Sequence, residues 1–102
     1  MATKMMPGGF SDPQPATQDI QEIVCKVKPQ FEQMTNETYG CFRAVIYRAQ
    51  VVAGMNYLVK VHLGNDSYAH LKIFVPLPVI NQPPILTAYQ IPKTKDDPLI
   101  PF

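Results

Sequence analysis

The feature that most constrains the fold is a change in hydrophobic spacing partway along the chain. Between positions 20 and 34, apolar residues recur every three or four positions, which is the period of an amphipathic helix. The members of this stripe are Ile20, Ile23, Val24, Val27, Phe31 and Met34. From position 41 onward the spacing falls to two, which is typical of strands with one buried face. One helix followed by several strands predicts an α+β fold.

The ends of the helix are marked by their own residues. Thr17 is the expected N-cap, and Asp19 brings a negative charge to the helix N-terminus, where the helix dipole favours it. Residues 36–40 should end the helix. Pro29 cannot donate a hydrogen bond to the carbonyl of Cys25, so we expect one helix with a kink near Cys25–Pro29, not two helices.

Four strands are expected, over residues 41–50, 56–63, 68–75 and 85–91. The second and third alternate between apolar and polar residues, and the turn-forming residues 64–67 join them. Matching their apolar faces predicts position 61 opposite 71 and position 62 opposite 70. The result is an antiparallel meander with the helix stripe lying across one of its faces.

Three segments lack periodicity and flank or interrupt these elements. They are an extended N-terminal arm at 1–16, a proline-rich loop at 76–84 and a C-terminal tail at 92–102. Most of the prolines cluster in these segments, and none of the clusters falls inside a predicted strand. No domain boundary or internal repeat is apparent, so we expect residues 1–102 to form a single domain.

Composition excludes several classes of partner. The 102 residues carry a net charge of only +1 and no basic stripe, so a nucleic-acid partner has little electrostatic support. No apolar run approaches the ~18 residues of a membrane span. The N-terminus lacks a secretory apolar region, which favours a cytoplasmic protein. In that compartment Cys25 and Cys41 are expected to be free thiols.

The segment between the first two strands is unusual for a hairpin. Two-residue hairpin turns favour pairs such as Asn-Gly, whereas Gln50-Val51-Val52-Ala53-Gly54 offers only one residue suited to positive φ, Gly54. Exposed valines at the tip would form a surface for a partner. Alternatively, Val51 and Val52 fold back under the sheet as part of the core. The local sequence leaves both interpretations open.

Two further segments should meet the 50–54 tip. In a meander, the loop at 76–84 lies at the same end of the sheet as that tip, whereas the 64–67 turn lies at the other end. The arm can also reach this end if it runs back along the helix or sheet. One apolar, nearly uncharged edge would then carry the arm residues from Met5 to Gly8, the two valines and Leu77-Pro78. Taken alone, Leu77-Pro78 is more simply interpreted as part of an ordinary loop.

Catalysis and metal binding have weak support. A cysteine nucleophile needs a nearby base, and neither Cys25 nor Cys41 has a local signature of one. The predicted register sets His62 opposite His70 on the outer sheet face, but no third metal ligand is evident. We therefore expect two solvated histidines, no cofactor and no enzyme, while a small cysteine-dependent enzyme stays as a rival hypothesis.

The pentapeptide at 50–54, followed by Asn56-Tyr57, resembles the first binding loop of the cystatins. Met6-Pro7-Gly8-Gly9, Leu77-Pro78 and Lys95-Asp96-Asp97 extend the resemblance to the type 1 cystatins, or stefins, from about Met5 to Phe102. The resemblance implies the cystatin fold, in which one long kinked helix packs across a four- to five-stranded antiparallel sheet. It also implies an inhibitor of papain-like cysteine proteases, such as papain and the lysosomal cathepsins (L, S, H and B).

The implied mechanism is a wedge that fills the protease cleft, giving reversible and competitive inhibition. Gly8 matches the glycine where the family's arm bends, with the residues before it in the non-primed subsites. The residues that the resemblance assigns to protease binding are Met5, Met6, Pro7, Gly8, Gly9, Gln50, Val51, Val52, Ala53, Gly54, Leu77 and Pro78. A non-inhibitory scaffold with the same fold is the alternative.

The resemblance also suggests an oligomeric hypothesis. Stefin-like proteins are prone to domain swapping, so a strained Val51–Ala53 tip would let the helix and strand 41–50 exchange between two chains. The active form is expected to be the monomer, because the swapped dimer would consume the loop.

Overall fold

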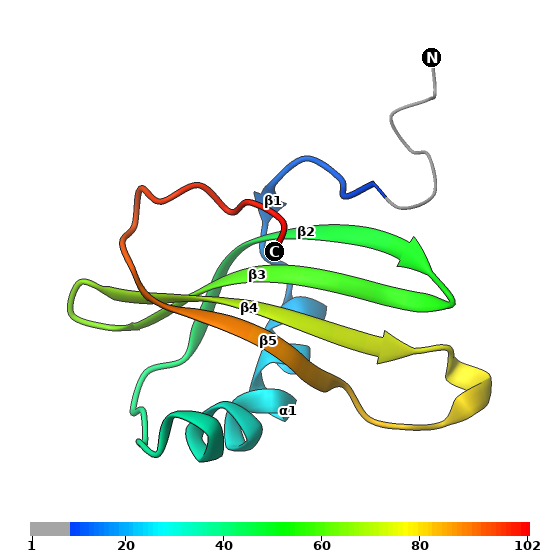
Figure 1. Ribbon diagram of the computed structural model, residues 1–102, viewed down its shortest axis with the longest axis horizontal. Coiled ribbons are helices and arrows are strands. Elements are labelled where there is room, and N and C mark those ends of the chain that lie inside the picture. Colours follow the sequence, from blue (N-terminus) through cyan, green and yellow to red (C-terminus); the bar gives the residue numbers. More distant parts are fainter. Residues whose placement is uncertain (1–8) are drawn as a thin grey trace.

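The computed structural model describes residues 9–102. Its elements in chain order are β1 (Gln14–Pro15), α1 (Gln18–Thr35), β2 (Arg43–Val52), β3 (Gly54–Gly64), β4 (Ser67–Pro76), the 3-10 helix η2 (Pro78–Ile80) and β5 (Ile85–Lys93). The strands form one antiparallel sheet in the order β1-β2-β3-β4-β5, and α1 lies across one face of it (Figure 1). This arrangement confirms the predicted α+β fold, with β1 as a short addition from the arm.

The helix begins and ends with capping geometry. The Thr17 hydroxyl accepts a hydrogen bond from the backbone N–H of Ile20 at 3.3 Å, which confirms the predicted N-cap. At the other end, Asn36 adopts the left-handed conformation with φ of 60°. Pro29 lies inside one continuous helix, as expected, because tertiary packing compensates for its missing donor.

The core lies between α1 and the inner face of the sheet. Its buried members are Ile20, Val24, Val27, Phe31, Phe42, Val59, Val61, Ala69, Leu71, Ile73 and Leu86. The predicted helix stripe is therefore largely correct, but Met34 is exposed. The buried helix residues end at Phe31, and four positions later the half-buried Thr35 takes the next place on that face.

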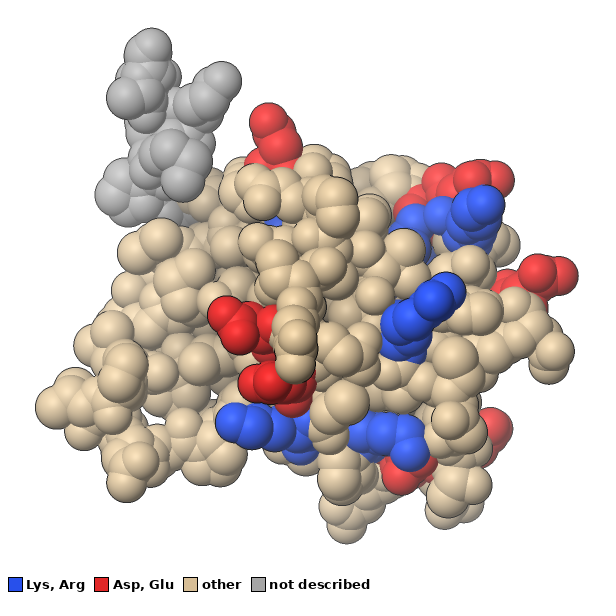
Figure 2. All heavy atoms as spheres, turned by 180° about the vertical axis from the view of Figure 1, so that it is seen from behind, with Lys and Arg blue, Asp and Glu red and all other residues tan. Residues whose placement is uncertain are grey.

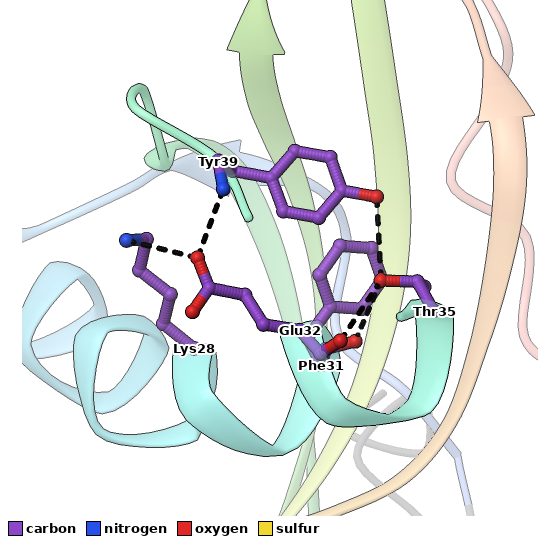
Figure 3. Close-up of polar contacts among 5 residues, drawn as sticks. All are labelled: Lys28, Phe31, Glu32, Thr35 and Tyr39. Carbon is purple, nitrogen blue, oxygen red and sulfur yellow. Dashed lines mark hydrogen bonds and ion pairs between the residues drawn. The ribbon is translucent and has the colours of Figure 1, made fainter. Parts of the chain in front are cut away.

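A polar and aromatic cluster fixes the connection from α1 to β2 (Figure 3). One Glu32 carboxylate oxygen accepts a hydrogen bond from the Tyr39 backbone N–H at 2.9 Å and pairs with Lys28 at 3.2 Å. These two donors lower the pKa of Glu32. The Tyr39 ring packs 5.2 Å from the ring of Phe31, and its hydroxyl lies 3.4 Å from the Thr35 hydroxyl. The chain leaving the helix is thus anchored back onto the helix.

The register between β3 and β4 differs from the prediction by two residues. Val61 pairs with Ala69, not with position 71, and His62 pairs with Tyr68, not with position 70. The connecting turn is tighter than expected, because Gly64 already pairs with Ser67. A shift of two preserves which side chains face the core, so the apolar pattern alone did not distinguish the two registers.

The outer face of the sheet is covered by the C-terminal tail (Figure 1). The Lys60 ammonium donates to the backbone carbonyls of Lys95 at 2.7 Å and Asp97 at 2.6 Å. Leu99 is buried at the end of this tail, and Lys60 and His70, which pair across β3 and β4, are buried beneath it. The expectation of two solvated histidines facing each other is therefore wrong.

Three prolines correct the prediction that strands would avoid the proline clusters. Pro15 lies in β1, Pro76 is the last residue of β4, and Pro92 lies in β5. β1 and β5 are the two edge strands, and the remaining proline ends a strand. At edges and ends a proline removes no ladder hydrogen bond that the sheet requires.

Candidate functional site

The tip between β2 and β3 is sharper than the sequence suggested. Strand pairing continues to Val52 opposite Gly54, so Ala53 alone lies between the two strands. The expected five-residue bend is therefore wrong in extent, because the valines extend β2 as paired residues. Val51 is 62% exposed and Val52 is 39% exposed, so the interpretation that they fold under the sheet is also wrong.

Gly54 makes this tight tip possible. Its φ is 124°, a backbone conformation that residues other than glycine rarely adopt. A Cβ atom there would lie 2.5 Å from the carbonyl oxygen of Val75 on the neighbouring strand. Val51, Val52 and Ala53 are not among the described residues with positive φ, so the unusual backbone conformation of the tip falls on the glycine, which accepts it without strain.

Gln50 is held by a neighbour across the hairpin. The side-chain amide of Asn56 donates to the Gln50 side-chain oxygen at 2.8 Å, and the two residues pair directly in the β2–β3 ladder. The sequence placed both residues near the tip but gave no indication of this contact. It fixes the polar side chain that precedes the exposed valines.

The loop between β4 and β5 lies beside the tip. Gly54 pairs with Pro76, so the start of β3 and the end of β4 meet at one end of the sheet, which confirms the predicted placement (Figure 1). Leu77 is 43% exposed and caps η2, where its carbonyl accepts from the Ile80 N–H at 2.9 Å. Pro78 is also exposed and begins the 3-10 turn.

The exposed apolar surface of this loop is larger than predicted. Val79 is 83% exposed and Ile80 is 53% exposed, and Ile85 at the start of β5 is exposed as well. From the sequence, only Leu77 and Pro78 of this loop were expected in the exposed apolar surface. The run of apolar residues within a loop, where backbone groups need water, was the available indication.

The arm runs along β2 toward the tip. The backbone N–H of Ser11 donates to the carbonyl of Ala49 at 2.7 Å, and the Ala49 N–H donates to the Ser11 hydroxyl at 3.0 Å. Arg48 fixes the same residue by donating to the Ser11 carbonyl at 2.8 Å. Gly9, the first described residue, is exposed. The expected site residues Met5, Met6, Pro7 and Gly8 lie outside the described residues.

The described part of this end of the molecule is uncharged. Residues 50–54 and 76–85 contain no Lys, Arg, Asp or Glu. In Figure 2 the end on the left is tan, without blue or red side chains, whereas the charged side chains lie over the middle and the opposite end. We call five exposed apolar residues of this end, Val51, Val52, Leu77, Val79 and Ile80, the apolar edge.

Comparisons with known proteins agree with this architecture. The Cystatin domain family matches residues 8–96, a range that contains both loops of the apolar edge. This chain belongs to the cystatin family. Cystatin-A of Homo sapiens is 57% identical over 98 residues, which cover 96% of this chain and 100% of the relative. Cystatin-A8 and leukocyte cysteine proteinase inhibitor 1, both of Sus scrofa, are each 54% identical over 99 residues, covering 97% of this chain and 96% of each relative.

Other possible functional sites in this cystatin have less structural support. Among the described residues, no group of three or more His, Cys, Asp and Glu side chains could hold a metal ion. No helix between residues 9 and 102 is long and apolar enough to cross a membrane. A shallow hollow lined by Thr17, Cys25 and Arg43 lies between α1 and the start of β2, away from the apolar edge. The edge is the candidate interface.

Proposed function

We propose that this cystatin is a reversible, competitive inhibitor of papain-like cysteine proteases and that the apolar edge enters the protease cleft. The observation that carries the proposal is the uncharged edge itself, on which Val51, Val52 and Leu77 are exposed although each would gain free energy by burial. Membership of a family that includes a protein named leukocyte cysteine proteinase inhibitor supplies the partner class.

The free energy gained by burying exposed side chains indicates that more than three of them are required for tight binding. Fully burying a Val or Leu side chain contributes about 1.5–3 kcal/mol, so the exposed parts of Val51, Val52 and Leu77 together supply roughly 2–4 kcal/mol. Nanomolar inhibition corresponds to about 12 kcal/mol. Val79 and Ile80 are exposed to a similar degree, and their burial would about double the contribution. The remainder falls to the arm and to polar contacts.

The arm residues Met5 to Gly9 complete the proposed wedge. We infer that they occupy the non-primed side of the protease cleft and that Gln50, Ala53, Gly54 and Pro78 complete the loops on the primed side. A protein that lacks residues 1–8 keeps the backbone hydrogen bond from Ser11 to Ala49 that ties the arm to β2. The truncated protein should therefore fold normally and dissociate faster from the protease, because most differences in affinity between related complexes arise in koff.

The test is a titration of papain with the purified monomer, using a small dipeptidyl substrate. Stoichiometric, competitive loss of activity at nanomolar protein is expected. Val52→Asp should weaken inhibition at least about 100-fold, because it would bury an unpaired charge in the interface. Ile91→Asp is the matched control, since Ile91 is 40% exposed and lies in β5 near the opposite end of the sheet.

Two outcomes would contradict the proposal. Absence of inhibition at micromolar protein would favour a non-inhibitory scaffold with the cystatin fold. Equal losses in Val52→Asp and Ile91→Asp would mean that the apolar edge is not the interface. Unfolding midpoints of both variants, together with Leu77→Asp as a second edge variant, separate a lost contact from a lost fold.

Oligomeric state and localisation belong to the same proposal. We infer an active monomer in the cytoplasm, with no catalytic activity of its own. Exchange of α1 and β2 between two chains would open the tip at Ala53 and remove the valines from the edge. Size-exclusion chromatography after warming, with inhibition measured on each fraction, tests this. A dimer that inhibits as well as the monomer would contradict it.

A further inference from the structure

Cys41 and His62 lie together at the end of the sheet opposite the apolar edge. Cys41 lies two residues before the start of β2, and the pairing of Arg43 with His62 brings the end of β3 beside it. The Cys41 Sγ atom is 3.9 Å from His62 Nδ1. Cys41 is half-buried and free of any disulfide. A thiol and an imidazole are therefore in reach of each other in a place that the proposed wedge does not use.

The contacts of His62 determine which ring nitrogen faces the thiol. Nε2 lies 2.7 Å from the backbone carbonyl oxygen of Asn65. A carbonyl oxygen only accepts hydrogen bonds, so Nε2 must carry the proton in this contact. In the neutral ring, Nδ1 then carries a lone pair and lies 3.9 Å from the Cys41 Sγ atom, and the backbone carbonyl oxygen of His62, at 3.6 Å, is a second acceptor for the thiol proton. The Tyr68 ring, with its centroid 4.8 Å from that of His62, packs against the imidazole.

This arrangement has the three parts of an activated nucleophile. Cys41 is the nucleophile, His62 is the base, and the Asn65 carbonyl orients the base. Gly64 leaves space beside Cys41, because even an added Cβ atom there would stand 3.7 Å from the Cys41 Cβ. Glycine at this position therefore adds no side chain against Cys41.

Cys25 provides an internal comparison. It is the more exposed of the two thiols, yet its described hydrogen-bond partner is the Gln21 side-chain amide nitrogen, 3.3 Å from Sγ. That nitrogen donates and cannot accept a proton. The Gln21 oxygen is already occupied by the Ala44 N–H at 2.8 Å. Solvent exposure favours a faster reaction of Cys25, whereas a neighbouring base favours a faster reaction of Cys41. The reaction rates of the two thiols therefore separate the effect of exposure from that of the base.

We propose that Cys41 is a redox modification site that forms a mixed disulfide with small disulfides such as glutathione disulfide, with His62 as its base. His62 Nδ1 takes the thiol proton, and the resulting thiolate attacks one sulfur of glutathione disulfide. The sulfur–sulfur bond of glutathione disulfide breaks as the new one forms. The leaving glutathione thiolate takes the proton from His62, so the products are the mixed disulfide and one reduced glutathione. This site is independent of the proposed protease inhibition.

The experiment compares two single-thiol proteins. Cys25→Ser leaves only Cys41, and Cys41→Ser leaves only Cys25. Each is incubated with glutathione disulfide at pH 7, and the initial rate of mass increase by one glutathione is measured by intact mass spectrometry. Cys41 should react at least about tenfold faster than Cys25, since a positioned base contributes that much or more. Equal rates, or a faster Cys25, would overturn the proposal.

A second comparison tests the base directly. His62→Gln in the Cys25→Ser protein should lower the rate at Cys41 to about that of Cys25, whereas the same substitution in the Cys41→Ser protein should leave Cys25 unchanged. Local opening of the turn would raise the rate at Cys41, so a fall identifies the lost base. An unchanged or raised rate would overturn the role of His62. Tyr68→Leu keeps both reacting groups and should give an intermediate rate. In urea the two single-thiol proteins should react equally.

Discussion

Burial of His70 makes the stability of this cystatin depend on pH. The side chain is fully buried, and neither ring nitrogen has a hydrogen-bond partner among residues 9–102. Burial, followed by the charges of Lys60 on β3 and Lys93 on β5, lowers the pKa of His70 from 6.5 to about 4, and Asp97 in the tail opposes this only partly. The folded protein therefore holds His70 neutral where the unfolded chain protonates it.

The sign and size of the effect follow from this difference. Between pH 6.5 and about 4 the unfolded chain binds more protons than the folded one, so stability falls as the pH falls through that window. Each pKa unit is worth about 1.4 kcal/mol, so the loss should approach about 3 kcal/mol and level off near pH 4. For a domain of this size, that is a large fraction of a typical free energy of unfolding.

His70→Leu is the variant that isolates the effect. Urea unfolding curves at pH 7, 6, 5 and 4 give the free energy of unfolding for the parent and the variant. The variant should lose about 3 kcal/mol less of its unfolding free energy between pH 7 and pH 4. Glu32 and Asp97, whose pKa values are lowered, also lose their stabilising contributions as the pH falls, but both residues are present in both proteins, and His70 is the smallest of the causes that lower the pKa of Asp97. Parallel curves for His70→Leu and the parent would refute the reasoning.

Two further substitutions test the tip and the tail, each against a matched control. Gly54→Ala should cost about 2 kcal/mol or more in unfolding free energy, because its φ is 124° and the new Cβ would meet the Val75 carbonyl, whereas Gly40→Ala meets nothing within 4 Å and should change it by less than about 0.5 kcal/mol. Leu99→Ala removes a buried side chain of the tail and should cost about 2–3 kcal/mol in urea unfolding, whereas the exposed Ile100→Ala should be nearly neutral. Equal losses of unfolding free energy within either pair would contradict the role assigned to Gly54 in the tip or to Leu99 in the tail.

Much of the candidate site was predictable because it depends on local chemistry. Val51 and Val52 stood out as apolar residues near a hairpin tip, and the single glycine identified the position of positive φ. Val79 and Ile80 were missed, because an apolar run within a loop indicates exposure in general, whereas the exposure of each side chain depends on how the loop packs. The arm residues Met5 to Gly8 stay a prediction.

The sequence by itself determined the helix, the four longer strands, their inward faces and the α+β class, because hydrophobic period and capping residues act over a few positions. Only the tertiary structure decided the β3–β4 register, since a two-residue shift leaves the faces unchanged. It also decided that the tail covers Lys60 and His70. Burial there is set by residues more than 25 positions away along the chain, which no local pattern records.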